Sequence, residues 1–439
     1  MKRKTFLFLA AIAVLLAVAC NTVSCKRTAP KSEKDFQAKV LEYTNNGDYI
    51  GRGILYAVHG DFELAVEDFT KAIEQNPNLS EAYLLRGRAL YAGVSDVIEV
   101  AENFERVGVW FQYGRRLSEE QAQAYDRAIE DFTQAIKLDE NNAVAYSDRG
   151  DAYSQIGDLD KAIADYDQAI KLNPKYAWAY NNRGNVYNHK DDRDKAIEDY
   201  TNAIKFDPQF TYPYYNRGGI YSSRSDYNRA IADFTQVIRL DPNYTEAYNS
   251  RGTEYYWRGN KRDYERAIVD YTQAIKLDPN NGFAYEFRGH VYREKGKLDM
   301  AIADYTEAIR LDSDDAYAYI SRGNAYREKG ELDLAIADYN EAVRVDYDDF
   351  WRVSAYTSRG DAYREKGELD MAIADYTEAI RSADDDIWQR NFAYVSRGDA
   401  YFDKGDYNSA IKDYNDYLEY YPDADDVKEK LEKAMQARR

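Results

Sequence analysis

Ten arginines, each followed by glycine, are the residues of this sequence whose type and spacing most clearly suggest chemistry. They are Arg52, Arg86, Arg149, Arg183, Arg217, Arg251, Arg288, Arg322, Arg359 and Arg397. An aspartate follows each of them, sixteen residues later in eight of the ten cases: Asp68, Asp131, Asp165, Asp199, Asp233, Asp270, Asp304, Asp338, Asp375 and Asp413. A guanidinium can bind a small anion or hold a carboxylate through two hydrogen bonds. Because ten identical copies favour a structural role, we expect Arg183 to pair with Asp199 and Arg217 with Asp233, inside one unit or across to the next.

Other residues that support catalysis or metal binding are sparse. The three histidines are scattered along the chain: His59, His189 and His290. The only two cysteines, Cys20 and Cys25, lie near the N-terminus. The sequence has no metalloprotease, serine-hydrolase, phosphate-loop or dinucleotide-binding motif, and the acidic run 384–386 lacks the glycine and terminal glutamate of a calcium loop. The sequence therefore predicts no catalytic residue, no metal site and no cofactor.

Residues 1–19 have the layout of a bacterial secretory signal peptide. A basic start precedes an apolar run over 6–19, which is too short to span a bilayer comfortably as a helix. Cys20 follows at once, and the segment resembles a lipoprotein signal, in which this cysteine becomes the lipidated first residue. Ala17 stands where that family prefers leucine, so plain secretion, an uncleaved anchor and lipidation of Cys25 stay open. The resemblance implies a lipid-anchored protein of the cell envelope that faces the periplasm or the cell surface.

The overall charge favours some partners over others. The formal net charge is −19 at pH 7. A field of this sign repels phosphate backbones, so nucleic acid is not an expected partner. It weakly favours basic partners, and contact with a membrane is expected only through the N-terminal lipid.

The spacing of the arginine–glycine pairs reveals internal repeats. Successive arginines are 34, 63, 34, 34, 34, 37, 34, 37 and 38 residues apart, and a period near 34 is typical of a helical solenoid. The gap of 63 indicates an insertion of 29 residues, at about 93–121. Around Arg183, packing positions recur at helical spacing on both sides of the polar run 190–194, and Pro208 ends the second segment. Each unit is therefore predicted to be a helix-turn-helix.

These units resemble the tetratricopeptide repeat. The positions that match its pattern are Tyr180, Gly184, Tyr187, Ala196, Tyr200 and Pro208. The match runs over 46–422 and implies an all-α, right-handed superhelical solenoid of about ten repeats. Residues 20–45 would hold the lipidated cysteine, a polar tether (26–35) and an N-terminal helix, and residues 423–439 a polar capping helix. One departure is systematic, since the arginine stands where the family usually has leucine.

A second stripe of each first helix varies between repeats, and in tetratricopeptide proteins this stripe lines a concave groove that binds peptides. Around Arg183 it consists of Trp178, Asn181, Asn182 and Asn185. The following repeats place there Tyr212, Tyr215, Asn216, Asn249, Tyr256 and Trp257, and then Phe283, Phe287, His290 and Tyr317. Asparagine can donate to and accept from a peptide backbone, and large aromatic residues outside the core are frequent binding anchors. We expect a partner to bind on this stripe, with a solvated helix face as the alternative.

Together these features predict a non-catalytic scaffold or adaptor of the bacterial cell envelope that binds a peptide or a partner protein. The alternative is a component that binds a small hydrophobic ligand and works with a transporter, which would require the groove to close into an apolar pocket. The insertion at 93–121 could dock a partner, cover the groove or pack on the N-terminal helices.

Overall fold

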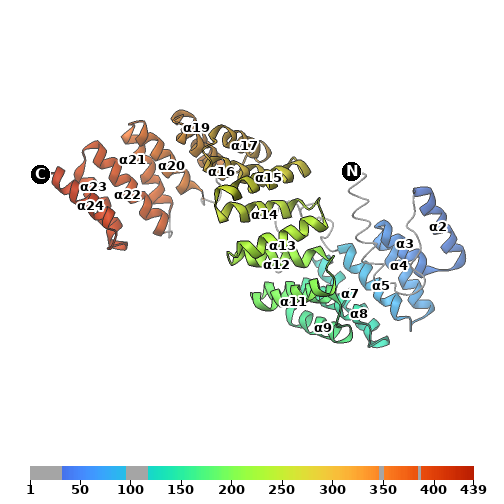
Figure 1. Cartoon of the computed structure of the whole chain (residues 1–439). Helices are drawn as coiled ribbons and strands as arrows, with labels where there is room; N and C mark the ends of the chain where they lie inside the picture. The colour runs from blue at the N-terminus through green and yellow to red at the C-terminus, as the bar shows by residue number, and fades with distance from the viewer. Residues whose placement is uncertain (1–31, 95–116, 346–350, 384–386) are drawn as a thin grey trace. The chain divides into compact units, whose positions relative to one another are not determined.

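The computed structural model describes residues 32–94, 117–345, 351–383 and 387–439. In these residues it contains twenty-two α-helices and no strand (Figure 1), so the all-α prediction is confirmed. None of the helices in these ranges combines the length and apolar character needed to cross a membrane. The predicted signal peptide and Cys20 lie outside the described residues.

The helices form ten pairs, one for each arginine–glycine unit. The first helices of the pairs are α3 (Tyr49–His59), α5 (Ser80–Val94), α8 (Ala143–Gln155), α10 (Ala177–His189), α12 (Thr211–Ser223), α14 (Thr245–Arg258), α16 (Gly282–Glu294), α18 (Ala316–Glu328), α20 (Arg352–Glu365) and α22 (Ile387–Lys404). The second helices are α4 (Phe62–Gln75), α7 (Glu119–Leu138), α9 (Leu159–Leu172), α11 (Arg193–Phe206), α13 (Tyr227–Leu240), α15 (Lys261–Leu277), α17 (Leu298–Leu311), α19 (Leu332–Val345), α21 (Leu369–Ser382) and α23 (Tyr407–Tyr420). Helices α2 (Glu33–Asn46) and α24 (Asp425–Ala437) stand at the two ends of the series. The chain divides into two compact units, residues 1–244 and 245–439, and within each of them successive helices pack on one another.

Local sequence explains where the helices begin and end. Asp192 caps α11, and its side chain accepts a hydrogen bond from the backbone N–H of Lys195. The same helix ends at Phe206, because the next residue, Asp207, is extended and the proline after it cannot continue the helix. The turn between α16 and α17 passes through Gly296, whose φ of 68° lies in the left-handed region that favours glycine. These signals recur with the sequence period, which confirms the helix-turn-helix units.

The core of each repeat combines small residues on both helices with one aromatic ring. In the fourth pair, Ala196 and Ala203 on α11 are fully buried, and Tyr200 between them in sequence is 1% exposed. The Tyr200 ring lies against Gly184 on α10, where an added Cβ would approach it to 2.8 Å. Glycine therefore lets the two helices approach closely. The cluster continues into the next repeat through Ile220 on α12, so each core joins consecutive pairs.

The tether expected over 26–35 ends earlier than predicted. Helix α2 begins at Glu33, because the side chain of Ser32 caps it by accepting a hydrogen bond from the backbone N–H of Asp35. At the other end of the chain, α24 packs on α23 through Val427, which is 1% exposed.

The predicted insertion at 93–121 has helical ends. Helix α5 continues to Val94, and α7 begins at Glu119 behind a capping box that Ser118 opens. The central part of the insertion, 95–116, lies outside the described residues.

Candidate functional site

Each of the ten arginines holds the aspartate of its own repeat. Arg183 donates from Nε and Nη2 to Asp199 over 2.8 and 2.7 Å, and Arg217 holds Asp233 in the same way over 2.9 and 2.8 Å. The other eight pairs use the same two nitrogens. Nη1 of Arg217 also donates to the hydroxyl of Thr201 in the preceding repeat, over 2.9 Å. The arginine thus connects the two helices of its own repeat to the repeat before.

Burial limits how much such a pair adds to stability. Desolvation raises the pKa of Asp233, although the hydrogen bonds and charge of Arg217 oppose this shift. Burial also lowers the pKa of Arg217, but the hydrogen bonds and charge of Asp233 outweigh it, so that this pKa lies above its usual value. Desolvation therefore offsets much of the attraction, while the two-bond geometry fixes how the helices sit. The donors of Arg217 are engaged inside the protein, which argues against a site for a small anion.

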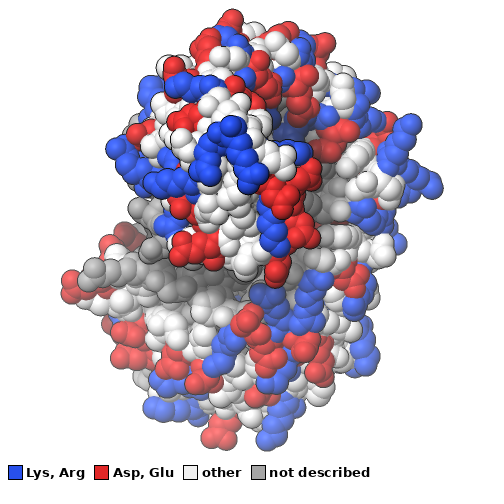
Figure 2. Space-filling model, turned by 90° about the vertical axis from the view of Figure 1, so that its left-hand side faces the viewer, with Lys and Arg blue, Asp and Glu red and all other residues white. Residues whose placement is uncertain are grey.

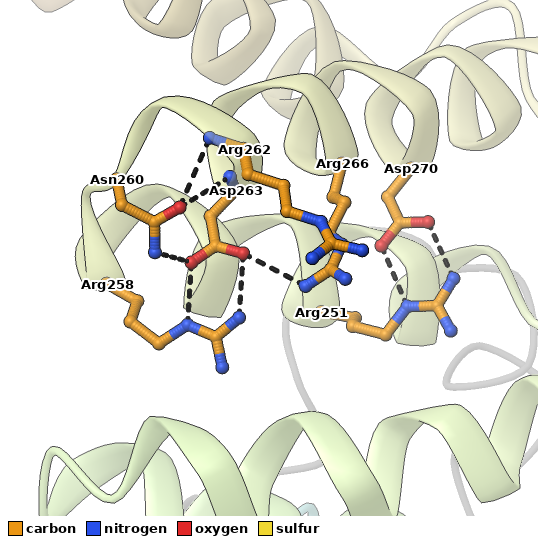
Figure 3. Close-up of polar contacts among 7 residues, drawn as sticks. All are labelled: Arg251, Arg258, Asn260, Arg262, Asp263, Arg266 and Asp270. Carbon is orange, nitrogen blue, oxygen red and sulfur yellow. Dashed lines mark hydrogen bonds and ion pairs between the residues drawn. The ribbon is translucent and has the colours of Figure 1, made fainter.

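The sixth repeat keeps its pair despite a longer turn. Arg251 and Asp270 are nineteen residues apart and still meet through two bonds of 2.8 and 2.7 Å (Figure 3). Asp263, in the first turn of α15 after the longer turn, is 1% exposed (Figure 3). Arg258 donates to it over two bonds of 2.7 Å and Arg266 over 3.1 Å. Ion pairs thus fix the lengthened turn, and the recurring pair does not depend on loop length.

The predicted asparagines of 1–244 bond to one another and to their neighbours inside the protein. The amide nitrogen of Asn182 donates to Asp151 over 2.7 Å, and that of Asn216 donates to Asn185 over 3.0 Å. Asn185 also accepts a hydrogen bond of 2.8 Å from the hydroxyl of Tyr200. These amides therefore connect the first helices of consecutive repeats.

One signal in the sequence could have revealed these bonds. The residue after each arginine–glycine pair faces the aromatic residue that follows the aspartate of the same repeat. Seven such pairs are joined by a hydrogen bond to a tyrosine hydroxyl: Asp151–Tyr166, Asn185–Tyr200, Thr253–Tyr271, His290–Tyr305, Asn324–Tyr339, Asp361–Tyr376 and Asp399–Tyr414. In the repeats with Ile54, Arg88 and Gly219 the aromatic residue is phenylalanine. The hydroxyl is present only in the repeats where the first helix offers it a partner.

Four residues predicted to line the binding groove are buried, which corrects that expectation. Asn181 and Asn249 are 4% and 8% exposed, Tyr215 is 8% exposed and His290 is 6% exposed. The ring of Tyr215 packs on Phe234 and Tyr244, with centroids 5.6 and 5.3 Å away. The sequence period identifies a stripe but not how closely the neighbouring first helix covers it, and α10 contacts α12 as α14 contacts α16.

Two predicted aromatic residues in 1–244 form a small surface patch. Trp178, which is half-buried, stacks on Phe210 with 5.4 Å between ring centroids. Tyr212 packs edge-on against the same ring at 6.0 Å and is 43% exposed. The patch lies at the start of α10 and α12.

A longer row of aromatic side chains crosses four repeats in residues 245–439. It consists of Tyr256, Trp257, Phe283, Phe287, His290, Tyr317 and Trp351, and it is called the aromatic row below. Neighbouring rings lie 4.2 to 6.5 Å apart from α14 to the start of α20. Trp257 and Phe283 are 59% and 44% exposed. All members of the row except Trp351 are predicted binding residues, and together they offer apolar surface that a partner can cover.

Charges and hollows elsewhere on the described residues have a different character. On the face shown in Figure 2, basic and acidic side chains are interspersed. One open hollow of about 350 Å³ is lined by Asp191, Asp192, Arg193, Asp194 and Arg224. Another of about 460 Å³ is lined by Tyr83, Ile129, Glu130, Asp131, Thr133, Gln134 and Lys137. Neither hollow includes a residue of the predicted binding stripe.

Similarity to known proteins extends over most of the chain. Crystal structures that it resembles include YrrB, a TPR protein with an unusual peptide-binding site (25% identity, 43% of this chain, 96% of that chain, TM-score 0.40). MamA is 28% identical over 40% of this chain and 92% of its own, with a TM-score of 0.36. A tetratricopeptide repeat protein from Parabacteroides merdae is 17% identical over 59% of this chain and 98% of its own, with a TM-score of 0.44. No curated protein sequence matches the chain. Models of the tetratricopeptide or TPR repeat match residues 50–95, 121–157, 150–191, 177–210, 212–244, 246–281, 289–326, 316–346, 353–386 and 393–423. Since these segments together span well over half of the sequence, the chain belongs to the tetratricopeptide repeat family.

Proposed function

We propose that this protein is a non-catalytic scaffold that binds a partner polypeptide across the first helices of residues 245–439. The aromatic row is the observation that carries the proposal. Exposed Trp257 and Phe283 can insert into a partner, and the half-buried rings beside them hold both side chains in place. Large aromatic side chains on a rigid surface contribute much of the binding energy of protein interfaces.

The shape of the row favours a polypeptide over a small hydrophobic ligand. The rings follow one another over four repeats, from α14 to the start of α20, instead of enclosing one cavity. The two open hollows, of about 350 and 460 Å³, are lined largely by charged and polar side chains. An extended row suits a chain that lies along it, because each repeat can contribute one contact.

The amides have a smaller part in this proposal than the sequence predicts. Asn182, Asn185 and Asn216 have partners inside the protein, so a peptide backbone would have to compete with those bonds. The aromatic rings require no such exchange, and we therefore assign recognition chiefly to them.

We further propose that a lipid on Cys20 holds the protein to a membrane of the bacterial cell envelope. The basic start, the short apolar run over 6–19 and the cysteine that follows support this proposal. The scaffold would then present its partner at the membrane surface, facing the periplasm or the cell exterior.

Site-specific photo-crosslinking in the native envelope tests the proposed binding surface. A photoreactive phenylalanine analogue at position 283 should capture a discrete polypeptide. The same analogue at Met300, which is 45% exposed on the second helix α17, is the matched control and should capture much less. Equal capture at the two positions, or none at 283, would contradict the proposal.

A further inference from the structure

One position of the first helix carries a carboxylate in a single repeat only. Two residues before each arginine, the ten repeats have Ile50, Leu84, Ser147, Asn181, Tyr215, Asn249, Glu286, Ile320, Thr357 and Val395. Most of these side chains are buried: Leu84 is 4% exposed, Ser147 0% and Ile320 3%. Apolar or neutral side chains thus fill this position in the other nine repeats, so packing there does not require the charge of Glu286.

The carboxylate of Glu286 is buried without a hydrogen-bond partner for Oε1. Glu286 is 9% exposed as a residue, and nothing in the described part of the chain donates to this oxygen. The Nε2 atom of His290, a residue that is itself 6% exposed, lies 3.7 Å from Oε1, beyond hydrogen-bond distance, and likewise has no hydrogen-bond partner. An unpartnered buried charge is costly, so its presence points to a ligand that completes the site.

The surroundings of Glu286 combine negative charge with aromatic rings. Burial and the charge of Glu286 raise the pKa of Asp315, the N-cap of α18, which places a second carboxylate nearby. Arg293, further along α16, is already paired with Glu328 at 3.3 Å. The site therefore has more acid than base among the described residues.

The aromatic row passes directly beside this carboxylate. Phe283, Glu286, Phe287 and His290 lie three, one and three residues apart, on one face of α16. The ring of Phe283 stacks on Phe287 with centroids 4.2 Å apart, and His290 contacts Tyr317 at 5.5 Å. Aromatic faces attract cations, most strongly where water is excluded.

We propose that Glu286 receives a lysine or arginine side chain of the bound polypeptide, with Phe283, Phe287 and Tyr317 flanking it. The aliphatic stem of such a side chain would pack on the rings, and its cationic head would satisfy the free oxygen of Glu286. The net charge of −19 adds a longer-range attraction for a basic segment. The side chain of Glu286 keeps 12% of its surface exposed while Oε1 itself is buried, so the cationic head would reach this oxygen by displacing the side chains that cover it.

This inference rests on the proposed function, and one selection experiment separates the two. The purified full chain is used to select binders from a display library of random linear peptides. Selected peptides should share a lysine or arginine beside apolar residues. Replacing that basic residue by the neutral norleucine should weaken binding to the wild-type protein tenfold or more, and should have little effect on binding to Glu286→Gln.

Two controls make the outcomes distinct. Glu307→Gln removes an exposed acid that pairs with Arg310 on α17, and it should bind the peptides as the wild type does. If peptides depend on Phe283 but bind Glu286→Gln and the wild type equally, the inference is overturned and the proposed function stands. If no selected peptide loses affinity on Phe283→Ala, the proposed function fails and the inference fails with it. Should Glu286→Gln not fold, the norleucine peptide on the wild-type protein decides alone.

Discussion

At the scale of single residues, the recurring arginine connects helices instead of serving a ligand. Two of its nitrogens hold the aspartate of its own repeat, and the third reaches back to the preceding one, as Arg217 does toward Thr201. A leucine could fill similar space, but it has no hydrogen bonds with which to fix the orientation of one helix against the other. We therefore expect the pair to specify how consecutive repeats align more than it raises net stability.

A double-mutant cycle on Arg217 and Asp233 tests this coupling. Arg217→Leu and Asp233→Leu should each reduce the free energy of unfolding by about 3–5 kcal/mol, because each leaves a buried charge without its partner. The double variant should recover about 1–3 kcal/mol relative to the sum of the two. Urea unfolding followed by circular dichroism measures all four proteins, and strictly additive losses would contradict a coupled pair.

Asp151 differs from the other aspartates that face a tyrosine hydroxyl. Asp361 forms an ion pair with Arg327 at 3.0 Å, and Asp399 forms one with Lys430 at 2.7 Å. Asp151 instead accepts hydrogen bonds from Tyr166 and Asn182, both over 2.7 Å. Burial, and then the charge of Asp148, raise its pKa to about 7 against the effect of its hydrogen bonds.

The raised pKa of Asp151 predicts a pH-dependent stability. Between its unfolded value of 3.8 and its folded value of about 7, the folded state retains a proton that the unfolded state releases. Stability therefore falls as pH rises through this window. Asp151→Asn should increase the free energy of unfolding at pH 8 by roughly 2 kcal/mol and change it little at pH 4. Thermal or urea unfolding at both pH values measures the difference.

The chain contains a natural counterpart of Asp151→Asn and a matched control for it. Asn185 already accepts a tyrosine hydroxyl and an asparagine amide in the geometry that Asp151 uses. Asp361→Asn removes the charge that pairs with Arg327 and should not stabilise the protein at pH 8. If Asp151→Asn and Asp361→Asn behave alike, burial of an unpaired carboxylate is not the cause.

At the scale of elements, the approach of the two helices in each repeat depends on the glycine after the arginine. In the fifth pair, a Cβ at Gly218 would lie 2.9 Å from the ring of Phe234, whereas one at the neighbouring Gly219 would meet nothing within 4 Å. Both glycines lie inside α12. The first is required by packing, and the second lowers helix stability without a packing reason.

These adjacent glycines should respond in opposite directions to alanine. Gly218→Ala should reduce the free energy of unfolding by about 1–3 kcal/mol, because it overpacks the contact with Phe234. Gly219→Ala should raise it by about 0.5–1 kcal/mol, because alanine favours the helix. Equilibrium unfolding of the two variants side by side makes the comparison, and changes of the same sign would refute this description of the helix contact.

The same contrast indicates how far the sequence could predict the elements and the site. The helix pairs and their ends could be predicted, because capping residues and prolines recur with the period of the sequence. The covering of Asn181, Asn249 and Tyr215 does not follow, because it depends on how closely the neighbouring first helix approaches. The bond from Tyr200 to Asn185 was predictable from the alternation of tyrosine and phenylalanine, but only once those positions are known to face each other.

At the scale of the whole molecule, the repeats place side chains from consecutive helices next to one another, so that they form a continuous surface. Exposed ion pairs also recur between consecutive repeats, for example Lys190–Asp160 and Lys329–Asp299, both at 2.8 Å. Such pairs each add little to stability. The aromatic row needs several repeats in succession, so its binding should depend on an intact stack within 245–439.

The proposed lipid anchor makes a prediction for the full chain in a bacterial host. Cys20→Ala should move the protein from the membrane fraction to the soluble fraction and remove its acylation, because a lipid supplies the only attachment in this account. Cys25→Ala is the matched control and should stay with the membrane. A Cys20→Ala protein that still carries lipid would contradict the assignment.

The proposed function requires that the aromatic row binds a polypeptide. Titration calorimetry with a peptide selected on the full chain measures this directly for the wild type, Phe283→Ala and Met300→Ala. Both replaced side chains are about half exposed, at 44% and 45%, so the two variants lose similar surface hydrophobicity. We expect binding at least tenfold weaker for Phe283→Ala and unchanged for Met300→Ala. Equal affinities for all three proteins would contradict the proposed function.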